Sequence, residues 1–293
     1  MTIYHAGELA VQRRLGQSDI AQRLSRMVRD EIPQAAADFL SEQPMAVLAA
    51  TDDARRVWAG LLTGPVGFMH VDDDVVHLDA LPVPGDPLHD VLNGRPRQVG
   101  MIAIEPQSRH RMRINGIATN TGAGLSIHPD QVYSNCPKYI SRRHIEGVSA
   151  PPARRDLRRT AVLDDGLRRR IAAADTFFIG SADPDGNADA SHRGGNPGFL
   201  EVLSPTRLRW PDYRGNSMFM TLGNIATNPS VGLLIPDWDT GSTLQLTGTA
   251  EIVWESAEGA QCFVEFDIAE VIEISDVSPL HWSTAALSPA NPA

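Results

Sequence analysis

The first 44 residues have the hydrophobic spacing of amphipathic helices. Apolar side chains recur close to the helical period between residues 7 and 40, among many arginine, glutamine and aspartate residues. This pattern predicts an N-terminal helical segment, residues 1–44, that caps the domain following it. A second interpretation, in which His5 or Glu8 also reaches a binding site, stays open at this point.

Strand-type patterns begin at Met45. Short apolar or alternating runs follow one another, separated by turn-forming Asp, Gly and Pro. The expected strands are residues 45–50, 57–62, 66–71, 75–78, 99–104, 111–118 and 125–127. A short helix is expected after Asp86-Pro87. These elements predict a first β domain at residues 45–148.

A similar series begins near Asp175. Its expected strands are residues 176–181, 188–193, 199–203, 208–210, 231–235 and 244–253. A helix is expected after Asn216. We place a second β domain at residues 165–282, a polar linker rich in Pro and Arg at 149–164, and a flexible tail at 283–293.

The two series are an internal repeat. Gly67-Phe68 corresponds to Gly198-Phe199 at an offset of 131 residues (198 − 67), and Gly100 corresponds to Gly232 at an offset of 132 (232 − 100). A drift of one residue over this length is typical of a duplicated fold with one loop change.

The composition and charge of the chain exclude some classes of protein function. The 293 residues are 42% hydrophobic and 21% charged, as in a globular protein, and the formal net charge of −10 argues against a general nucleic-acid or anionic-membrane binder. No secretory signal and no apolar run long enough to span a bilayer are visible in the sequence. Two cysteines form neither a disulfide framework nor a zinc site, so we expect a cytoplasmic protein without a metal centre.

The candidate chemistry lies in the second β domain. Ser191, Arg193 and Gly194 follow one another on an alternating strand, and Asn216 and Ser217 precede the expected helix. Arginine presents a fork of donors suited to phosphate, glycine lets a backbone approach a ligand, and a helix start offers free N–H groups. This spacing predicts one phosphate-bearing cofactor between the strand and the helix start.

The order of these motifs resembles the pyridoxamine-phosphate-oxidase-like, FMN-binding split-barrel family, in its two-barrel bacterial branch. The resemblance rests on the Ser-x-Arg strand, the loop and helix start, Asn228-Pro229 and the Gly-Leu-Leu-Ile strand at 232–235. It extends to the His-x-Gly-Glu-x-x-x-Gln segment at 5–12 and Cys-Pro-Lys-Tyr-Ile at 136–140. It implies a mostly β fold with some α, made of two tandem FMN-binding split β-barrels with an N-terminal helical cap.

The resemblance also implies a set of cofactor-binding residues. They are Ser191, Arg193, Gly194, Asn216, Ser217, Thr221, Asn224, Gln245, Lys138 and Trp282. Of these, Gln245 is implied near the flavin ring and Trp282 in the cofactor pocket, where a simple aromatic core role is equally open. His192 alternates to the opposite strand face and is expected to be structural, and Cys136 is expected to be inert.

The two copies differ where the phosphate would bind. Residues 191–193 of the second barrel correspond to Gly60-Leu61-Leu62 of the first, and Asn216-Ser217 corresponds to a segment around Asp86-Pro87. The first barrel therefore lacks phosphate-binding groups. The resemblance implies that it takes the place of a partner subunit, which leaves one flavin per chain.

We therefore expect an FMN-dependent oxidoreductase that acts on a small organic molecule, with NAD(P)H or a reductase as the reductant and a homodimer as a further expectation. The alternatives are a deazaflavin- or haem-binding protein of the same fold, and a non-catalytic flavin-binding or storage protein. No residue is singled out as a catalytic acid or base. Hydrolase, zinc-protease and phosphate-loop motifs do not occur in the sequence.

Overall fold

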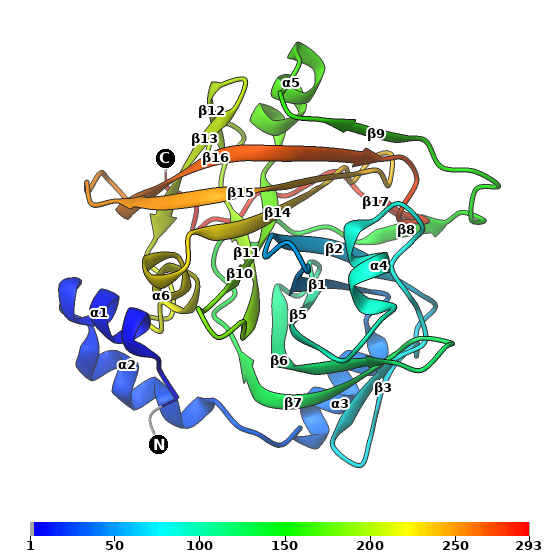
Figure 1. The fold of residues 1–293 in the computed structure, drawn as a ribbon, viewed down its shortest axis with the longest axis horizontal. Helices are drawn as coiled ribbons and strands as arrows, with labels where there is room; N and C mark the ends of the chain where they lie inside the picture. The colour runs from blue at the N-terminus through cyan, green and yellow to red at the C-terminus, as the bar shows by residue number, and fades with distance from the viewer. Residues whose placement is uncertain (1–2, 293) are drawn as a thin grey trace.

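The computed structural model describes residues 3–292 and has the expected fold class, mostly β with some α (Figure 1). Two large antiparallel sheets, one from each half of the chain, form the body of the molecule. Each sheet is open, because its two edge strands are not paired with each other. This is the arrangement expected of split rather than closed barrels.

The first sheet has the strand order β2-β1-β5-β6-β7-β4-β3. Its strands are β1 (Met45–Thr51), β2 (Val57–Thr63), β3 (Met69–Asp72), β4 (Val75–Leu78), β5 (Arg97–Glu105), β6 (His110–Asn120) and β7 (Leu125–Ser134). Helix α4 (Pro87–Leu92) begins at Asp86, whose carboxylate accepts a hydrogen bond from the Leu88 N–H at 2.8 Å. The expected strand at 66–71 begins only at Met69, because Gly67 lies in a turn with φ of 91°.

The second sheet has the order β11-β10-β14-β15-β16-β13-β12. Its strands are β10 (Thr176–Ala182), β11 (Ala188–Gly194), β12 (Glu201–Ser204), β13 (Arg207–Tyr213), β14 (Ser230–Pro236), β15 (Thr243–Val253) and β16 (Ala260–Ile274). Helix α5 (Asp165–Ala173) precedes this series, and helix α6 (Met220–Thr227) joins β13 to β14.

The two sheets have one and the same topology. Adding nine to each strand number of the first sheet gives the order of the second. Even the irregularities correspond: a β-bulge follows Asn115 in the β6–β7 pairing, and another follows Thr247 in the β15–β16 pairing, 132 residues later (247 − 115). A shared strand order and a shared bulge are what a duplicated fold produces.

The sheets meet face to face at close backbone crossings. A Cβ atom added at Gly100 would lie 2.4 Å from the Ala190 nitrogen, and one at Gly232 would lie 2.6 Å from the Val57 oxygen. The core of the first barrel continues across this contact, since it includes Phe178 and Ile272 of the second barrel.

We expect Gly100→Ala and Gly232→Ala each to lower the free energy of unfolding by about 1–3 kcal/mol, because the added methyl group would push apart two packed backbones. Urea denaturation followed by tryptophan fluorescence measures the change. Gly94→Ala is the matched control, because no atom lies within 4 Å of its built Cβ. Equal stability of all three variants would contradict the close crossing.

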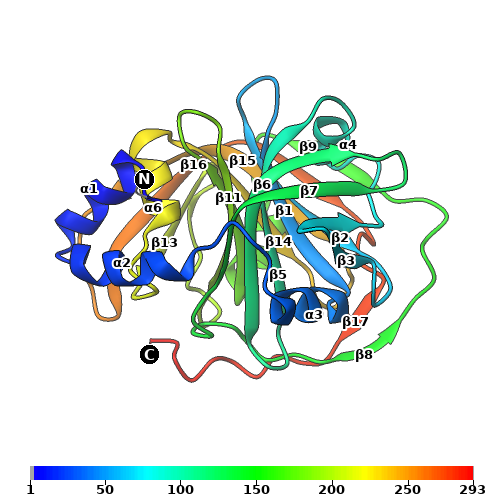
Figure 2. The ribbon, with the colours of Figure 1, turned by 90° about the horizontal axis from the view of Figure 1, so that it is seen from below.

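The N-terminal region is a series of short helices rather than one long one: α1 (Ala6–Arg14), α2 (Ser18–Leu24), a 3-10 turn (Ser25–Met27) and α3 (Gln34–Glu42). Gly16, at φ of 65°, ends the first of them. Helix α1 packs on α6 of the second barrel, where Gly7 and Gly223 allow close contact, whereas α3 packs on β3 of the first (Figures 1 and 2). The cap therefore covers both barrels and not only the one that follows it in sequence.

The segment expected as a linker, residues 149–164, contains a paired strand, because β9 (Leu157–Thr160) pairs with β16. Just before the linker, β8 (Ile145–Val148) pairs with β17 (Leu280–Trp282), which directly precedes the expected tail. Further along the tail, Ala286 forms a bridge with Arg142, and the Pro292 oxygen accepts a hydrogen bond from the Asn196 amide at 2.9 Å. No helix within residues 3–292 is long and apolar enough to cross a membrane.

A candidate phosphate site between the barrels

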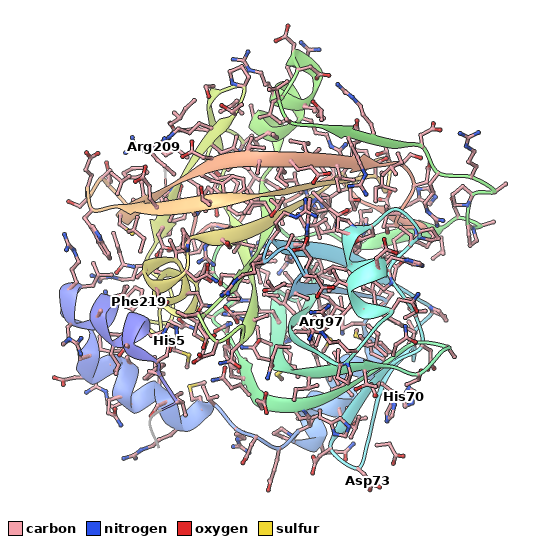
Figure 3. The ribbon with its side chains drawn as sticks, in the orientation of Figure 1. His5, His70, Asp73, Arg97, Arg209 and Phe219 are labelled. Carbon is pink, nitrogen blue, oxygen red and sulfur yellow. The ribbon has the colours of Figure 1, made fainter. Side chains whose placement is uncertain are left out.

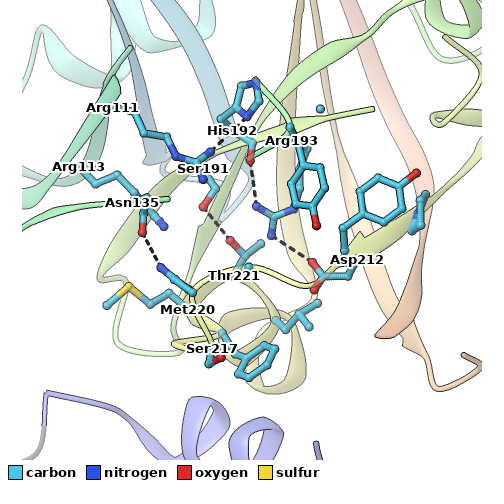
Figure 4. A pocket seen from close by; sticks show the side chains of 18 of the residues that line it. Arg111, Arg113, Asn135, Ser191, His192, Arg193, Asp212, Ser217, Met220 and Thr221 are labelled. Carbon is cyan, nitrogen blue, oxygen red and sulfur yellow. Dashed lines mark hydrogen bonds and ion pairs between the residues drawn. The ribbon is translucent and has the colours of Figure 1, made fainter. Parts of the chain in front are cut away.

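One pocket contains six of the ten predicted site residues (Figure 4). They are Ser191, Arg193, Gly194, Asn216, Ser217 and Thr221. The pocket measures about 100 Å³, is partly open to solvent, and is lined by aromatic rings that include Phe199, Tyr139 and Tyr213. Its volume and its arginines suit a small anionic group.

Strand β11 supplies the first group of side chains. The Ser191 hydroxyl accepts a hydrogen bond from Thr221 Oγ1 at 3.0 Å, which ties β11 to helix α6. The Arg193 guanidinium lies 3.5 Å from Asp212 on β13 and donates to the His192 carbonyl at 3.2 Å. Arg193 keeps its Nε atom buried and without a partner, so part of its fork of donors is unused.

The loop before α6 closes the pocket on another side. Asn216 donates to Asn135 of the first barrel, and Ser217 donates to Gln17 of the N-terminal segment. The helix itself begins later than expected, with Phe219 as a cap residue that makes no side-chain capping bond. Ser217 and Phe219 both have φ of 60°, a left-handed conformation that is costly for non-glycine residues.

Two further arginines of the pocket come from the first barrel and were not predicted from the sequence. Arg111 and Arg113 both lie on β6 and line the pocket. Their counterparts in the second barrel are Thr243 and Gln245, at an offset of 132 residues (243 − 111 and 245 − 113). This replacement of two uncharged residues by two arginines was the signal in the sequence that could have identified them.

Of the three arginines that line the pocket, Arg111 is the one that has no carboxylate partner among the described residues. It donates to His192 Nδ1 at 3.2 Å and to the Cys136 carbonyl at 2.7 Å, and its Nε atom is buried and unpartnered. No carboxylate in the described chain lies within ion-pair distance of it. Burial, together with the positive charges of Arg113 and Arg193, lowers the pKa of Arg111 to about 9.

His192 is buried and neutral. Burial, with Arg111 and Arg193 as neighbouring cations, holds its pKa well below the usual value. Because Nδ1 accepts from Arg111, the ring proton is on Nε2, which has no partner. Its ring packs edge-on against Phe178 at 5.7 Å. His192 therefore positions Arg111. This contact was not predicted from the sequence, because the alternation of the strand places His192 on the face opposite to Ser191 and Arg193.

Arg113, in contrast, is paired with a carboxylate, although its Nε atom is also buried and unpartnered. It forms an ion pair across the barrel interface with Asp189, and the side chains of both are at most 5% exposed. Tyr133 also donates to this carboxylate, at 3.2 Å. Each of the three arginines has a buried Nε atom without a partner, but they differ in their carboxylates. Arg113 is closely paired with Asp189, Arg193 lies 3.5 Å from Asp212, and Arg111 has no carboxylate partner among the described residues.

The other four predicted residues lie outside this pocket. Asn224 lines a separate cavity and donates to Ser181 at 3.0 Å. Gln245 is buried between the barrels and donates to the Ala59 carbonyl at 2.8 Å and to Asp86 at 3.0 Å. Trp282 packs edge-on against Trp238 at 5.3 Å. Lys138 is exposed in the loop before Tyr139.

The equivalent position in the first barrel is filled and has no cationic side chain. There Gln245 replaces Arg113, and its amide contacts Asp86, whose pKa is raised to about 6 mainly by burial. Gly60 packs against the same carboxylate, since a built Cβ there would lie 2.7 Å from it. A buried carboxyl group disfavours a phosphate, so this position in the first barrel does not suit an anion.

Comparisons with known proteins agree with the fold. Residues 163–274 match the family model for pyridoxamine 5'-phosphate oxidase. No curated protein matches the chain. Among solved structures, a putative pyridoxamine 5'-phosphate oxidase from Lactobacillus delbrueckii is 20% identical over 38% of this chain and 94% of its own, with a TM-score of 0.32.

Two other solved structures align over similar lengths. An F420 reductase is 17% identical over 41% of this chain and 98% of its own, with a TM-score of 0.26. The heme storage protein HutZ from Vibrio cholerae is 11% identical over 44% of this chain and 99% of its own, with a TM-score of 0.27. The family match at residues 163–274 covers the strands and the helix that carry Ser191, Arg193 and Thr221, so the second barrel is similar in sequence to the pyridoxamine 5'-phosphate oxidase family.

Proposed function

We propose that this protein is an FMN-dependent oxidoreductase that holds one flavin per chain at the interface of its two barrels. The observation that carries the proposal is Arg111, a partly buried guanidinium without a carboxylate partner, which points into the same pocket as Arg193 (Figure 4). A dianionic phosphate would satisfy the unused donors of both side chains. The residues present therefore fit the phosphate end of FMN.

The roles of the pocket residues follow from their contacts. Arg111 and Arg193 would bind the phosphate from opposite barrels, with Ser191, Ser217 and Thr221 as hydroxyl donors. When bound, FMN would supply the hydride or electron transfer, which protein side chains cannot perform. The aromatic side chains at the pocket offer apolar surface to a planar ring and would keep water away from it.

Other parts of the proposal rest on the sequence and the family resemblance. We propose a small organic molecule as the substrate, NAD(P)H or a reductase as the source of electrons, and a homodimer as the assembly. A cytoplasmic location remains a prediction, based on two cysteines that are both unpaired.

We expect about one equivalent of FMN per chain, because the equivalent position in the first barrel presents Asp86 and Gln245 instead of arginines. Absorbance of the flavin released from purified, saturated protein measures the ratio. Two tightly bound equivalents would contradict the assignment. A Soret band or a deazaflavin spectrum would instead favour haem or a deazaflavin as the ligand, and a bound flavin that no acceptor reoxidises would favour storage.

A further inference from the structure

A second and larger cavity lies next to the phosphate site, and nothing in the proposed function uses it. It measures about 590 Å³, is open to solvent, and is lined by the N-terminal segment, strands β6, β7 and β11, and helix α6. Figure 3 shows His5, one of its lining residues, where α1 meets α6. Met220 is the residue common to both sites.

The charge of this cavity is opposite to that of the phosphate site. Three arginines and one aspartate line the phosphate site. Five carboxylates and one arginine line the second cavity: Glu8, Asp30, Asp130, Asp183, Asp189 and Arg29. An anionic group would be repelled here, whereas a cation would be attracted.

One of these carboxylates has an unused acceptor. Asp189 is 3% exposed, and its Oδ1 atom accepts from Arg113, from Asn115 at 3.2 Å and from Tyr133 at 3.2 Å. Its Oδ2 atom is buried and has no hydrogen-bond partner. A buried carboxylate oxygen without a donor is costly, so a ligand with N–H groups would be stabilised at this point of the cavity wall.

Glu8 contributes a second buried carboxyl group. It is 4% exposed, and its Oε2 accepts from the His5 N–H at 2.8 Å. His5 Nδ1 accepts from the Gly7 N–H at 3.1 Å, so the neutral ring carries its proton on Nε2 and donates it to Asn224 at 2.9 Å. Burial, with help from Asp189 and Asp183, raises the pKa of Glu8 to about 8.

We propose that this cavity binds a small organic cation that carries N–H donors, such as a primary ammonium or guanidinium group. A metal ion fits less well, because no three His, Cys, Asp or Glu side chains of residues 3–292 converge as metal ligands. The size of the cavity and its apolar members Ile3 and Met220 suit an organic body attached to the charged group. That this cation is the substrate rests on the proposed function. That the cavity binds a cation does not rest on it.

Benzylguanidinium and its neutral counterpart benzylurea test the proposal, because they are nearly isosteric and differ in charge. With the purified full-length protein, calorimetry should detect benzylguanidinium binding, and benzylurea should bind at least about tenfold more weakly. Glu8→Gln should weaken benzylguanidinium binding by about tenfold at about pH 9, while glutamine keeps the acceptor for the His5 N–H. Glu42→Gln, on the exposed end of α3, is the matched control and should change nothing.

The pH dependence gives a second signature. Benzylguanidinium stays charged throughout, so its affinity should rise with pH as Glu8 ionises and should be nearly flat in Glu8→Gln. The charged groups that face Glu8 are Asp189, Asp183 and Arg113, with His5 as its neighbour on α1. The loss of this pH dependence in Glu8→Gln would assign the rise to Glu8.

The expected results of these variants distinguish cation binding in this cavity from FMN binding at the phosphate site. Arg193→Ala should lose FMN but keep benzylguanidinium, and Glu8→Gln should keep FMN, which also shows that it is folded. The double variant Asp30→Asn/Asp130→Asn, on the exposed rim, should weaken the cation independently. Equal binding of benzylurea and benzylguanidinium, or displacement of benzylguanidinium by FMN, would overturn the proposal, and the latter would make the cavity part of the flavin site.

Discussion

Arg193→Ala should weaken FMN binding by roughly 10- to 150-fold, because a charge-assisted hydrogen bond contributes about 1.5–3 kcal/mol and each 1.4 kcal/mol is about tenfold. The guanidinium lies in the candidate phosphate pocket with an unused Nε donor. Fluorescence titration of apoprotein with FMN measures the loss. Riboflavin, which lacks the phosphate, should bind the natural protein and the variant almost equally.

Three further variants sharpen this test. Arg193→Lys should recover only part of the affinity, because a point charge cannot reproduce the planar fork. Arg193→Ala also leaves Asp212 without its cation, so Arg193→Ala/Asp212→Asn separates loss of the phosphate contact from this new unpaired charge. Arg111→Ala should weaken FMN similarly from the first barrel, if both arginines bind one phosphate.

Arg209→Ala is the matched control for these arginine substitutions. Arg209 lies on β13 away from the pocket and pairs with Glu255 at 3.3 Å (Figure 3). FMN affinity should be unchanged in this variant. Full FMN affinity in a folded Arg193→Ala protein would place the phosphate elsewhere and contradict the assignment of β11.

Arg113→Ala should lower the free energy of unfolding by about 3–5 kcal/mol, because it leaves the Asp189 carboxylate buried without its cation. This ion pair joins β6 of the first barrel to β11 of the second, and its side chains are 5% and 4% exposed. Urea denaturation measures the change. The replacement also removes a contact between the barrels, so their transitions should separate if the barrels unfold independently.

Arg95→Ala provides the comparison for a surface ion pair. Arg95 and Asp53 are 3.1 Å apart, but their side chains are 71% and 77% exposed. Solvent screens such a pair, so its loss should lower the free energy of unfolding much less than the loss of the buried pair. If Arg113→Ala were no more destabilising than Arg95→Ala, the inter-barrel pair would not contribute to holding the two halves together.

Most strands could be predicted because their signals are local. Apolar runs such as residues 45–50 and 176–181 are buried on both faces and became β1 and β10 with small changes at their ends. The predicted length of strand β7 was too short, at residues 125–127, because Pro129 and Asp130 disfavour a strand. Pairing with β6 across a bulge carries the strand through to Ser134.

The packing of the N-terminal cap, in contrast, could not be predicted from local sequence signals. Its helical spacing was clear, but the chain bends at Gly16 and crosses from one barrel to the other. The partner of α1 is α6, more than 200 residues away in sequence, and no periodicity within the first 44 residues specifies that contact. The burial of Glu8 against Gly223 follows from it.

The sequence by itself determined one half of the candidate phosphate pocket, because Ser191 and Arg193 share one strand face and residues 216–221 lead into the next helix. Only the tertiary structure decided the other half. Arg111 reaches His192 across 81 residues of sequence, and Arg113 reaches Asp189 across 76. Such contacts depend on how the two barrels dock, and the docking is set by glycine crossings and buried charge between surfaces that no local pattern describes.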